Sequence, residues 1–106
     1  MADARQTYPD GMNVGIVGAT GLVGEFMIAS LMERKFPVRS LRLFASERSA
    51  GKRLPWNDTH IVVENAATAD YAGLDIVFFS AGGETSLSLA PRVAAAGAIV
   101  IDNSSA

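Results

Sequence analysis

The stretch from Asn13 to Gly24, NVGIVGATGLVG, constrains the fold of this chain more than any other part of the sequence. Its first residues are mostly β-branched and suit a short strand buried on both faces, as in the middle of a parallel sheet. Gly18, Gly21 and Gly24 follow, and residues 25–35 are typical of a helix. A strand, a glycine turn and a helix N-terminus in succession expose unpaired backbone N–H groups, which attract an anion. We interpret this stretch as the pyrophosphate cradle of a dinucleotide.

The spacing of these glycines leaves an alternative open. It is G-x-x-G-x-x-G rather than G-x-G-x-x-G, so the plain dinucleotide fingerprint is not matched. The strand before the turn and the helix after it are the context that favours a dinucleotide. A tight turn that binds nothing is the alternative. A Walker-type phosphate loop is excluded because no Lys-Ser or Lys-Thr pair closes the turn.

Composition narrows the class of protein further. The 106 residues, 49% of them hydrophobic, predict one domain with a packed core. A net charge of −2 gives no reason to expect nucleic acid, and no apolar run approaches the roughly 20 residues that span a membrane. Without cysteine there is no disulfide, thiolate metal site or cysteine nucleophile, and we expect no metal site. Residues 1–11 are polar and lack the apolar segment of a signal peptide, so we expect a flexible leader, a domain at residues 12–106 and a cytoplasmic location.

The rest of the chain alternates strands with helical or crossover segments, which predicts an α/β fold with a doubly wound, mainly parallel sheet. After the strand at residues 13–17, we expect strands at residues 40–45, 60–64, 75–80 and 98–102, an extended segment at 54–56, a turn at 57–58, short helical turns at 65–72 and a helix at 85–96. The strand at 75–80 is apolar on both faces and is expected to be central. The first helix, at residues 21–35, is predicted to bury Leu22, Val23, Phe26, Met27, Ser30 and Leu31.

Polar and glycine-rich loops follow four of the expected strands, at residues 18–24, 46–53, 80–83 and 103–105. Ligands of an open parallel sheet bind outside the carboxyl ends of the strands. Four such loops at one edge of the sheet favour a long ligand over a single phosphate.

The loop after the second strand is where the two nicotinamide cofactors are usually distinguished. An acidic residue there binds the ribose 2′-hydroxyl group of NAD, whereas an arginine accepts the 2′-phosphate group of NADP. Arg48 offers a charged fork, and Ser46 and Ser49 offer hydroxyl donors, so NADP is the better fit. Glu47 leaves NAD as an alternative cofactor, because its carboxylate is able to bind the ribose diol. A basic loop that is merely solvated is the remaining alternative.

Other candidates for chemistry are better explained as structural residues. His60 is the only histidine, and no cysteine, serine elbow or second histidine pairs with it. Asp75 is expected to cap a turn, and Asp102 to be a buried hydrogen-bonding group. Ser104 and Ser105 match no hydrolase motif, because Gly-x-Ser-x-Gly is absent. We therefore expect no catalytic residue in this chain.

Several motifs in order resemble the start of the aspartate-semialdehyde dehydrogenase family: VGIVGATGLVG, RLFASERSAGK, DIVFFSAGGETS and LAPRVAAAGAIVIDNSSA. The resemblance covers nearly all of the chain after residue 12 and implies a Rossmann-type NADP-binding domain, incomplete relative to the full family fold. The family uses NADPH to reduce L-4-aspartyl phosphate to L-aspartate 4-semialdehyde with release of phosphate, in lysine (diaminopimelate), threonine, methionine and isoleucine biosynthesis. The resemblance implies NADP(H) as the partner of this chain, and a small-molecule substrate and a homo-oligomer for the full-length enzyme.

The resemblance also implies roles for single residues. Around the glycine turn that begins with Gly18, it places Thr20, Gly21, Leu22 and Val23 along the diphosphate. It places Arg48 and Ser49 on the 2′-phosphate group, Ser80, Ala81 and Gly82 beside the cofactor, and Asn103 with the two serines after it toward the nicotinamide. In the family a Phe-Arg pair follows the Asn-Ser-Ser-Ala motif, and the cysteine nucleophile, a glutamine and a histidine lie downstream in a catalytic and dimerisation domain. None of these is among the 106 residues, so we expect cofactor binding without turnover.

Three other functions are weighed against this resemblance. N-acetyl-γ-glutamyl-phosphate reductase shares the fold and the reaction type, but the SERSAGK and DNSSA segments argue against it. An extended short-chain dehydrogenase needs a Tyr-x-x-x-Lys pair, and neither Tyr8 nor Tyr71 has a lysine four residues later. A non-catalytic NADP-binding or sensing module stays open.

Overall fold

Six strands and two helices alternate along residues 11–34, 36–80 and 83–102, which are the residues that the computed structural model describes. Their bounds are β1 Met12–Val17, α2 Leu22–Glu33, β2 Val38–Ala45, β3 Arg53–Trp56, β4 Thr59–Asn65, β5 Ile76–Phe79, α3 Gly83–Ala95 and β6 Ile99–Asp102. Every strand and both long helices expected from the sequence are present, but the short helical turns expected at residues 65–72 are not. The predicted leader, except Gly11, and residues 103–105 lie outside the described residues.

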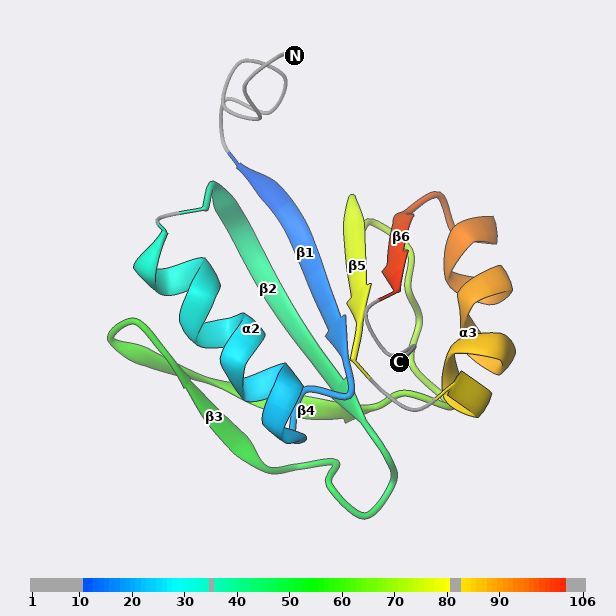
Figure 1. Ribbon diagram of the computed structural model, residues 1–106, viewed down its shortest axis with the longest axis horizontal. Coiled ribbons are helices and arrows are strands. Elements are labelled where there is room, and N and C mark those ends of the chain that lie inside the picture. Colours follow the sequence, from blue (N-terminus) through cyan, green and yellow to red (C-terminus); the bar gives the residue numbers. More distant parts are fainter. Residues whose placement is uncertain (1–10, 35, 81–82, 103–106) are drawn as a thin grey trace.

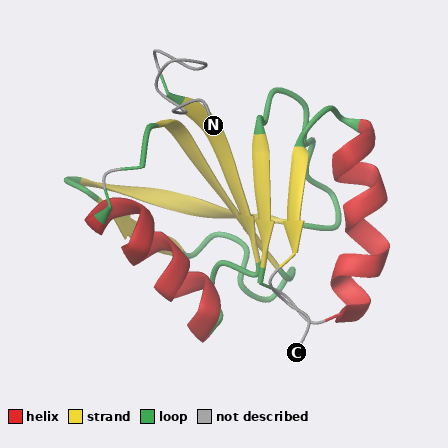
Figure 2. Ribbon diagram, turned by 45° about the horizontal axis from the view of Figure 1, so that its top comes forward, coloured by secondary structure: helices red, strands yellow, loops and turns green. Residues whose placement is uncertain are grey.

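The strands form one sheet in the order β3-β4-β2-β1-β5-β6 (Figure 1). Strands β4, β2, β1, β5 and β6 pair in parallel, and β3 pairs antiparallel with β4. Helix α2 packs on one face of the sheet and α3 on the other, as the two ribbon views show (Figures 1 and 2). The predicted doubly wound, mainly parallel α/β fold is confirmed, and β5 lies between β1 and β6 as expected.

The core has one layer on each face of the sheet. Leu43 and Phe44 are neighbours on β2 and are both fully buried, but they point to opposite faces. Leu43 packs with the layer under α2, and Phe44 packs with the layer under α3. Burying a large apolar side chain contributes about 1.5–3 kcal/mol, so these layers fix the position of the carboxyl ends of the strands.

The hairpin between β3 and β4 turns at Asn57 and Asp58, where the sequence predicts a turn. Asn57 has a φ of 53°, which asparagine tolerates better than most residues. Pro55 is accommodated because β3 is at the edge of the sheet, where a missing N–H donor costs little.

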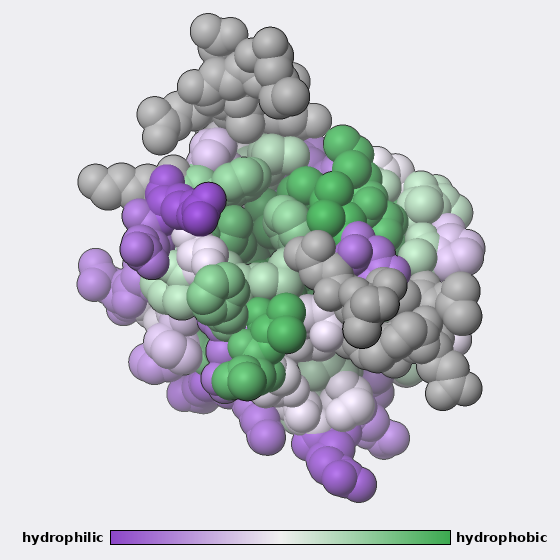
Figure 3. Space-filling view, in the orientation of Figure 1, coloured by the Kyte–Doolittle hydropathy of each residue, from purple (hydrophilic) through white to green (hydrophobic). Residues whose placement is uncertain are grey.

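Helix α2 does not bury the face that the sequence predicts. Of the predicted residues Leu31 is buried, but Leu22, Val23 and Phe26 are 86%, 49% and 72% exposed. The physical reason is Gly24, whose Cβ position would collide with the carbonyl oxygen of Gly18 and would lie 2.7 Å from the Cα atom of Ala19. Only a glycine fits there, so Gly24 faces the glycine turn. The residues one and two turns later, Ile28 and Leu31, are then buried with it. Figure 3 shows the hydrophobic area that this orientation leaves over α2.

Two aspartates differ from their predicted roles. Asp102, expected to be buried, is exposed at the end of the edge strand β6. Asp75 precedes β5, and its carboxylate accepts a 2.7 Å hydrogen bond from the backbone N–H group of Asn13 on β1. Asp75 therefore ties two strands together at their amino ends, because the parallel register places it beside Asn13. Neither of the described helices is long and apolar enough to cross a membrane.

Candidate functional site

The glycine turn lies at the carboxyl end of β1 and is fastened to the end of β2. The backbone N–H groups of Gly18 and Ala19 donate to the carbonyl oxygen of Phe44 at 2.8 and 3.1 Å. Gly18 has a φ of 87°, a left-handed conformation that favours glycine. Gly24 allows α2 to pack directly on the turn, whereas a Cβ at Gly21 would meet only the carbonyl oxygen of Gly18, at 3.6 Å. The middle glycine thus leaves the outer side of the turn open to a ligand.

The N-terminus of α2 adds donors beside this turn. Gly21 is its N-cap residue and supplies no side chain to cap the helix. The first N–H groups of a helix have no partner inside the helix, and its dipole places partial positive charge there. Leu22 and Val23 in the exposed first turn carry no charge, and Glu25 is the acidic residue of that turn. The chemistry of this end of α2 fits a phosphate group.

The loop after β2 lies against the glycine turn. The hydroxyl group of Thr20 donates to that of Ser49 at 3.3 Å, which joins the two loops. The N–H groups of Ser49 and Ala50 donate to the carbonyl oxygen of Ser46 at 2.9 and 3.0 Å, so the loop is tightly turned. Arg48 is exposed on this loop and makes no ion pair with any residue that the structure describes.

A pocket of about 510 Å³ opens at the carboxyl ends of β1, β2 and β4. Its lining combines apolar residues with a few polar side chains: Val17, Gly18, Thr20, Ala45, Ser46, Glu47, Asn65, Ala66, Ala67, Ser88 and Leu89. Its volume and mixed lining are typical of a small-molecule site. An apolar pocket beside the uncapped N-terminus of a helix fits the two chemical parts of a dinucleotide, a nucleoside and a diphosphate.

The structure brings most of the predicted site residues to this edge of the sheet. Gly18, Thr20 and Ser46 line the pocket, and Ser49 contacts Thr20 next to it. Arg48 is on the adjoining loop and is not part of the lining. The hydroxyl group of Ser80 lies 2.8 Å from the carbonyl oxygen of Gly18, so it fastens the glycine turn to the end of β5. Three predicted residues lie outside the described residues: Ala81, Gly82 and Asn103.

Two walls of the pocket are not among the predicted site residues. One is the loop after β4, with Asn65, Ala66 and Ala67, and the other is α3, with Ser88 and Leu89. The rule on carboxyl ends of parallel strands applies to β4 too, but its alanine-rich loop carries no polar or glycine signal. The α3 wall has no sequence signal, because it depends on which strands the helix crosses. Glu47, considered only as the argument for NAD, also lines the pocket.

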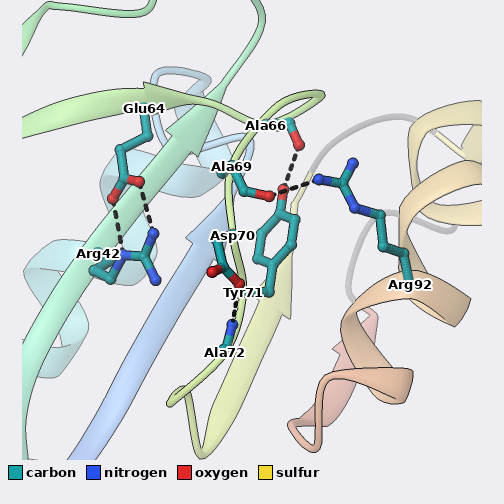
Figure 4. A network of polar contacts seen from close by, with 8 residues as sticks. All are labelled: Arg42, Glu64, Ala66, Ala69, Asp70, Tyr71, Ala72 and Arg92. Atoms are coloured by element: carbon teal, nitrogen blue, oxygen red, sulfur yellow. Dashed lines mark hydrogen bonds and ion pairs between the residues drawn. The ribbon is translucent and has the colours of Figure 1, made fainter.

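A polar network holds the alanine-rich loop (Figure 4). The hydroxyl group of Tyr71 donates to the carbonyl oxygen of Ala66 at 2.6 Å, and the guanidinium group of Arg92 donates to those of Ala67 and Ala69 at 2.7 and 2.6 Å. Burial raises the pKa of the Tyr71 hydroxyl group above its ordinary value. Tyr71 is therefore a neutral donor throughout the physiological pH range.

An ion pair lies beside this network, between strands β2 and β4. Arg42 and Glu64 form two hydrogen bonds of 2.9 and 2.7 Å. These hydrogen bonds raise the pKa of Arg42 further above its already high ordinary value. No group of three or more metal-ligating side chains occurs in the part of the chain that the structure describes. The charged groups in this part of the sheet thus serve to join strands and loops.

Comparison with known proteins connects this geometry to a family. Residues 13–106 match the family model described as "Semialdehyde dehydrogenase, NAD binding domain". An aspartate-semialdehyde dehydrogenase of Streptomyces akiyoshiensis is 65% identical over 95 residues, which are 90% of this chain and 27% of that protein. The enzyme of Mycolicibacterium smegmatis is 55% identical over 95 residues, which are 90% of this chain and 28% of that protein.

Solved structures agree with the sequence relatives. Aspartate semialdehyde dehydrogenase II of Vibrio cholerae, solved in complex with ASA, matches 88% of this chain and 30% of its own, with 50% identity and a TM-score of 0.85. The enzyme of Candida albicans, solved with NADP, matches 88% of this chain and 29% of its own, with 28% identity and a TM-score of 0.69. The chain spans 27–30% of the length of these relatives.

Proposed function

Because the chain belongs to the aspartate-semialdehyde dehydrogenase family as its NAD-binding domain, we propose that it binds NADP(H) for the reduction of L-4-aspartyl phosphate to L-aspartate 4-semialdehyde. The observation that carries this proposal is the pocket at the carboxyl ends of β1, β2 and β4, next to the uncapped N-terminus of α2. The family defines the reaction class, and the pocket defines which part of the enzyme this chain supplies.

Different parts of the site bind different parts of the cofactor. The unpaired backbone N–H groups at the start of α2 hold the diphosphate, beside Thr20 and Gly21. The pocket between the glycine turn, the alanine-rich loop and α3 takes the adenosine half. When bound, the cofactor supplies the hydride for the reduction, and this chain holds and orients it.

We base the choice of NADP on the loop after β2. Arg48 is exposed and has no anionic partner among the described residues, so its guanidinium group is available for a 2′-phosphate group. Ser49 offers a hydroxyl group next to Thr20 at the edge of the pocket. Glu47 works against a 2′-phosphate group by like charge, so the net preference depends on Arg48 outweighing it.

We expect no catalysis by the chain alone. The thioester route that the family resemblance implies needs a cysteine thiolate, and the sequence has no cysteine. A hydride donor that is positioned without its acceptor gives no turnover. The 106 residues therefore account for cofactor binding, and the other side chains of the reaction belong to the rest of a full-length enzyme.

Calorimetric titration of the purified chain with NADP and NAD tests the proposal. We expect saturable binding of both cofactors, with NADP bound more tightly. In an assay of NADPH formation from aspartate semialdehyde and phosphate, we expect no activity, with a full-length relative as the positive control. Absence of binding by either cofactor would contradict the proposed function, and tighter binding of NAD would contradict only the choice of NADP.

A further inference from the structure

The alanine-rich loop at residues 65–69 starts at the last residue of β4, has no regular secondary structure after Asn65, and forms one wall of the pocket. Its first residues are held by backbone hydrogen bonds: the N–H group of Ala66 donates to Ala45 at the end of β2, at 2.8 Å. The carbonyl oxygens of Ala66, Ala67 and Ala69 accept hydrogen bonds from side chains instead of from the backbone. The shape of this wall therefore depends on two side chains that are not themselves in the pocket lining, Tyr71 and Arg92.

Arg92 connects this wall to the neighbouring wall. It lies on α3, three and four residues after Leu89 and Ser88, which line the pocket. Residues at these spacings lie on the same face of a helix. From that face its guanidinium group donates to the carbonyl oxygens of Ala67 and Ala69, so one side chain ties the loop to the helix (Figure 4). Hydrogen bonds from a charged donor are shorter and stronger than neutral ones.

Tyr71 connects the same loop to the glycine turn. Its buried ring packs on the ring of Phe44, with 4.7 Å between the two ring centroids. The guanidinium group of Arg92 lies 5.4 Å from the centroid of the Tyr71 ring. The carbonyl oxygen of Phe44 accepts the N–H groups of Gly18 and Ala19. The contacts of Tyr71 thus run from the alanine-rich loop to the residue that fixes the glycine turn.

We propose that Arg92 and Tyr71 are positioning residues of the dinucleotide pocket, because they hold the loop at residues 65–69 in its binding-competent shape without touching the ligand. The inference rests on the proposed function, which makes this pocket the site of the adenosine half. The adenine ring and its ribose are common to NAD and NADP, which differ only in the 2′-phosphate group on that ribose. Loosening the loop should therefore weaken the binding of both cofactors by the same factor. A change at Arg48 should instead alter the ratio of the two affinities.

The test compares Arg92→Ala and Tyr71→Phe with the wild-type chain by calorimetry, well below the unfolding temperature of each variant. Tyr71→Phe keeps the ring and removes only the hydroxyl group, so it still tests the proposal if Arg92→Ala does not fold. Arg39→Ala is the matched control, since Arg39 is exposed at the amino end of β2, away from the pocket. If the competent loop falls to between a third and a tenth of the population, affinity falls by roughly three- to tenfold.

We expect this loss for NADP and NAD alike, with their ratio unchanged, and faster amide hydrogen exchange at residues 66–69 in the variants. Arg92→Lys should restore only part of the affinity, because an ammonium group does not present the planar fork that spans two carbonyl groups. Variants that stay folded and bind both cofactors as the wild type does would overturn the inference alone. A wild-type chain that binds neither cofactor would overturn the proposed function, and the inference with it.

Discussion

At the scale of single residues, we propose that Arg48 and Glu47 decide which cofactor the site prefers. They are adjacent on the loop after β2 and carry opposite charges, with Glu47 in the pocket lining and Arg48 exposed beside it. A hydrogen bond between a guanidinium group and a phosphate group is charge-assisted and suits the fork of the arginine. We therefore assign the 2′-phosphate group to Arg48 and expect Glu47 to weaken that preference.

Arg48→Ala should weaken NADP binding by about 1.5–3 kcal/mol, or roughly tenfold to 150-fold, and leave NAD binding almost unchanged. Calorimetric titration of both cofactors measures this difference, and Arg39→Ala controls for the loss of one positive charge. Equal NADP affinity in wild type and Arg48→Ala would remove Arg48 from the site.

Tyr71 makes the stability of the domain depend on pH in the alkaline range. Burial raises the pKa of its hydroxyl group above the ordinary value of about 10, so the folded chain holds this proton more tightly than the unfolded chain does. The resulting stability is fully present below the unfolded pKa and is lost as the pH rises through the folded pKa. Urea unfolding between neutral pH and pH values above about 10 should show this fall. Tyr71→Phe should show a smaller fall, and an identical fall in both proteins would show that Tyr71 is not its source.

At the scale of elements, the strands follow from the sequence and the orientation of α2 does not. Runs such as residues 75–80 are apolar on both faces, and a buried parallel strand is the structure that such a run permits. Helix α2 has apolar side chains on more than one side, so its periodicity does not single out one face. Its orientation is decided by the close approach of Gly24 to Gly18, a tertiary contact between a helix and a turn.

The site, like the fold, has parts that the sequence predicts and parts that it does not. The glycine turn and the basic loop are predictable because glycine, serine and arginine at the ends of strands carry a chemical signal. The alanine-rich loop gives no such signal, and its place in the pocket follows only from the pairing of β4 with β2. The face of α3 that carries Leu89 and Arg92 likewise requires the order of strands in the sheet.

Gly24→Ala tests the packing of α2 on the glycine turn. An alanine gains up to about 1 kcal/mol in helix propensity, but its Cβ meets backbone atoms of Gly18 and Ala19, which have no room to move. We expect a net loss of about 1–3 kcal/mol in the free energy of unfolding by urea. Gly21→Ala is the control, because a Cβ there meets only one atom, at 3.6 Å, and should cost less than about 1 kcal/mol. Equal stability of Gly24→Ala and wild type would show that the helix is free to shift.

At the scale of the whole molecule, one face of the sheet is only partly covered. Ile99 and Ile101 of β6 are 55% and 37% exposed, and their partners on β5, Ile76 and Phe78, pack with the layer under α2. Together with the exposed start of α2, they form the hydrophobic areas visible in Figure 3 over α2 and over β5 and β6. Exposed apolar area of this kind promotes association.

We expect the isolated chain to self-associate as its concentration rises. Sedimentation measurements over a range of concentrations test this, and Phe26→Glu should shift the equilibrium toward the monomer because Phe26 is 72% exposed and its replacement costs little core packing. Asp58→Asn, in the exposed β3–β4 turn beside the C-terminal part of α2 rather than its exposed start, is the control. A wild-type chain that stays monomeric at every concentration would contradict this expectation.

The central claim is that the carboxyl ends of β1, β2 and β4 form a dinucleotide site, and mapping of backbone amide NMR signals during titration with NADP tests it most directly. We expect the shifts to concentrate at residues 18–22, 46–49, 65–67 and 88–89, with little change at the opposite edge, around Asn13, Asn57 and Gly73. Shifts that concentrate at that opposite edge, or a spectrum that NADP leaves unchanged, would contradict the account.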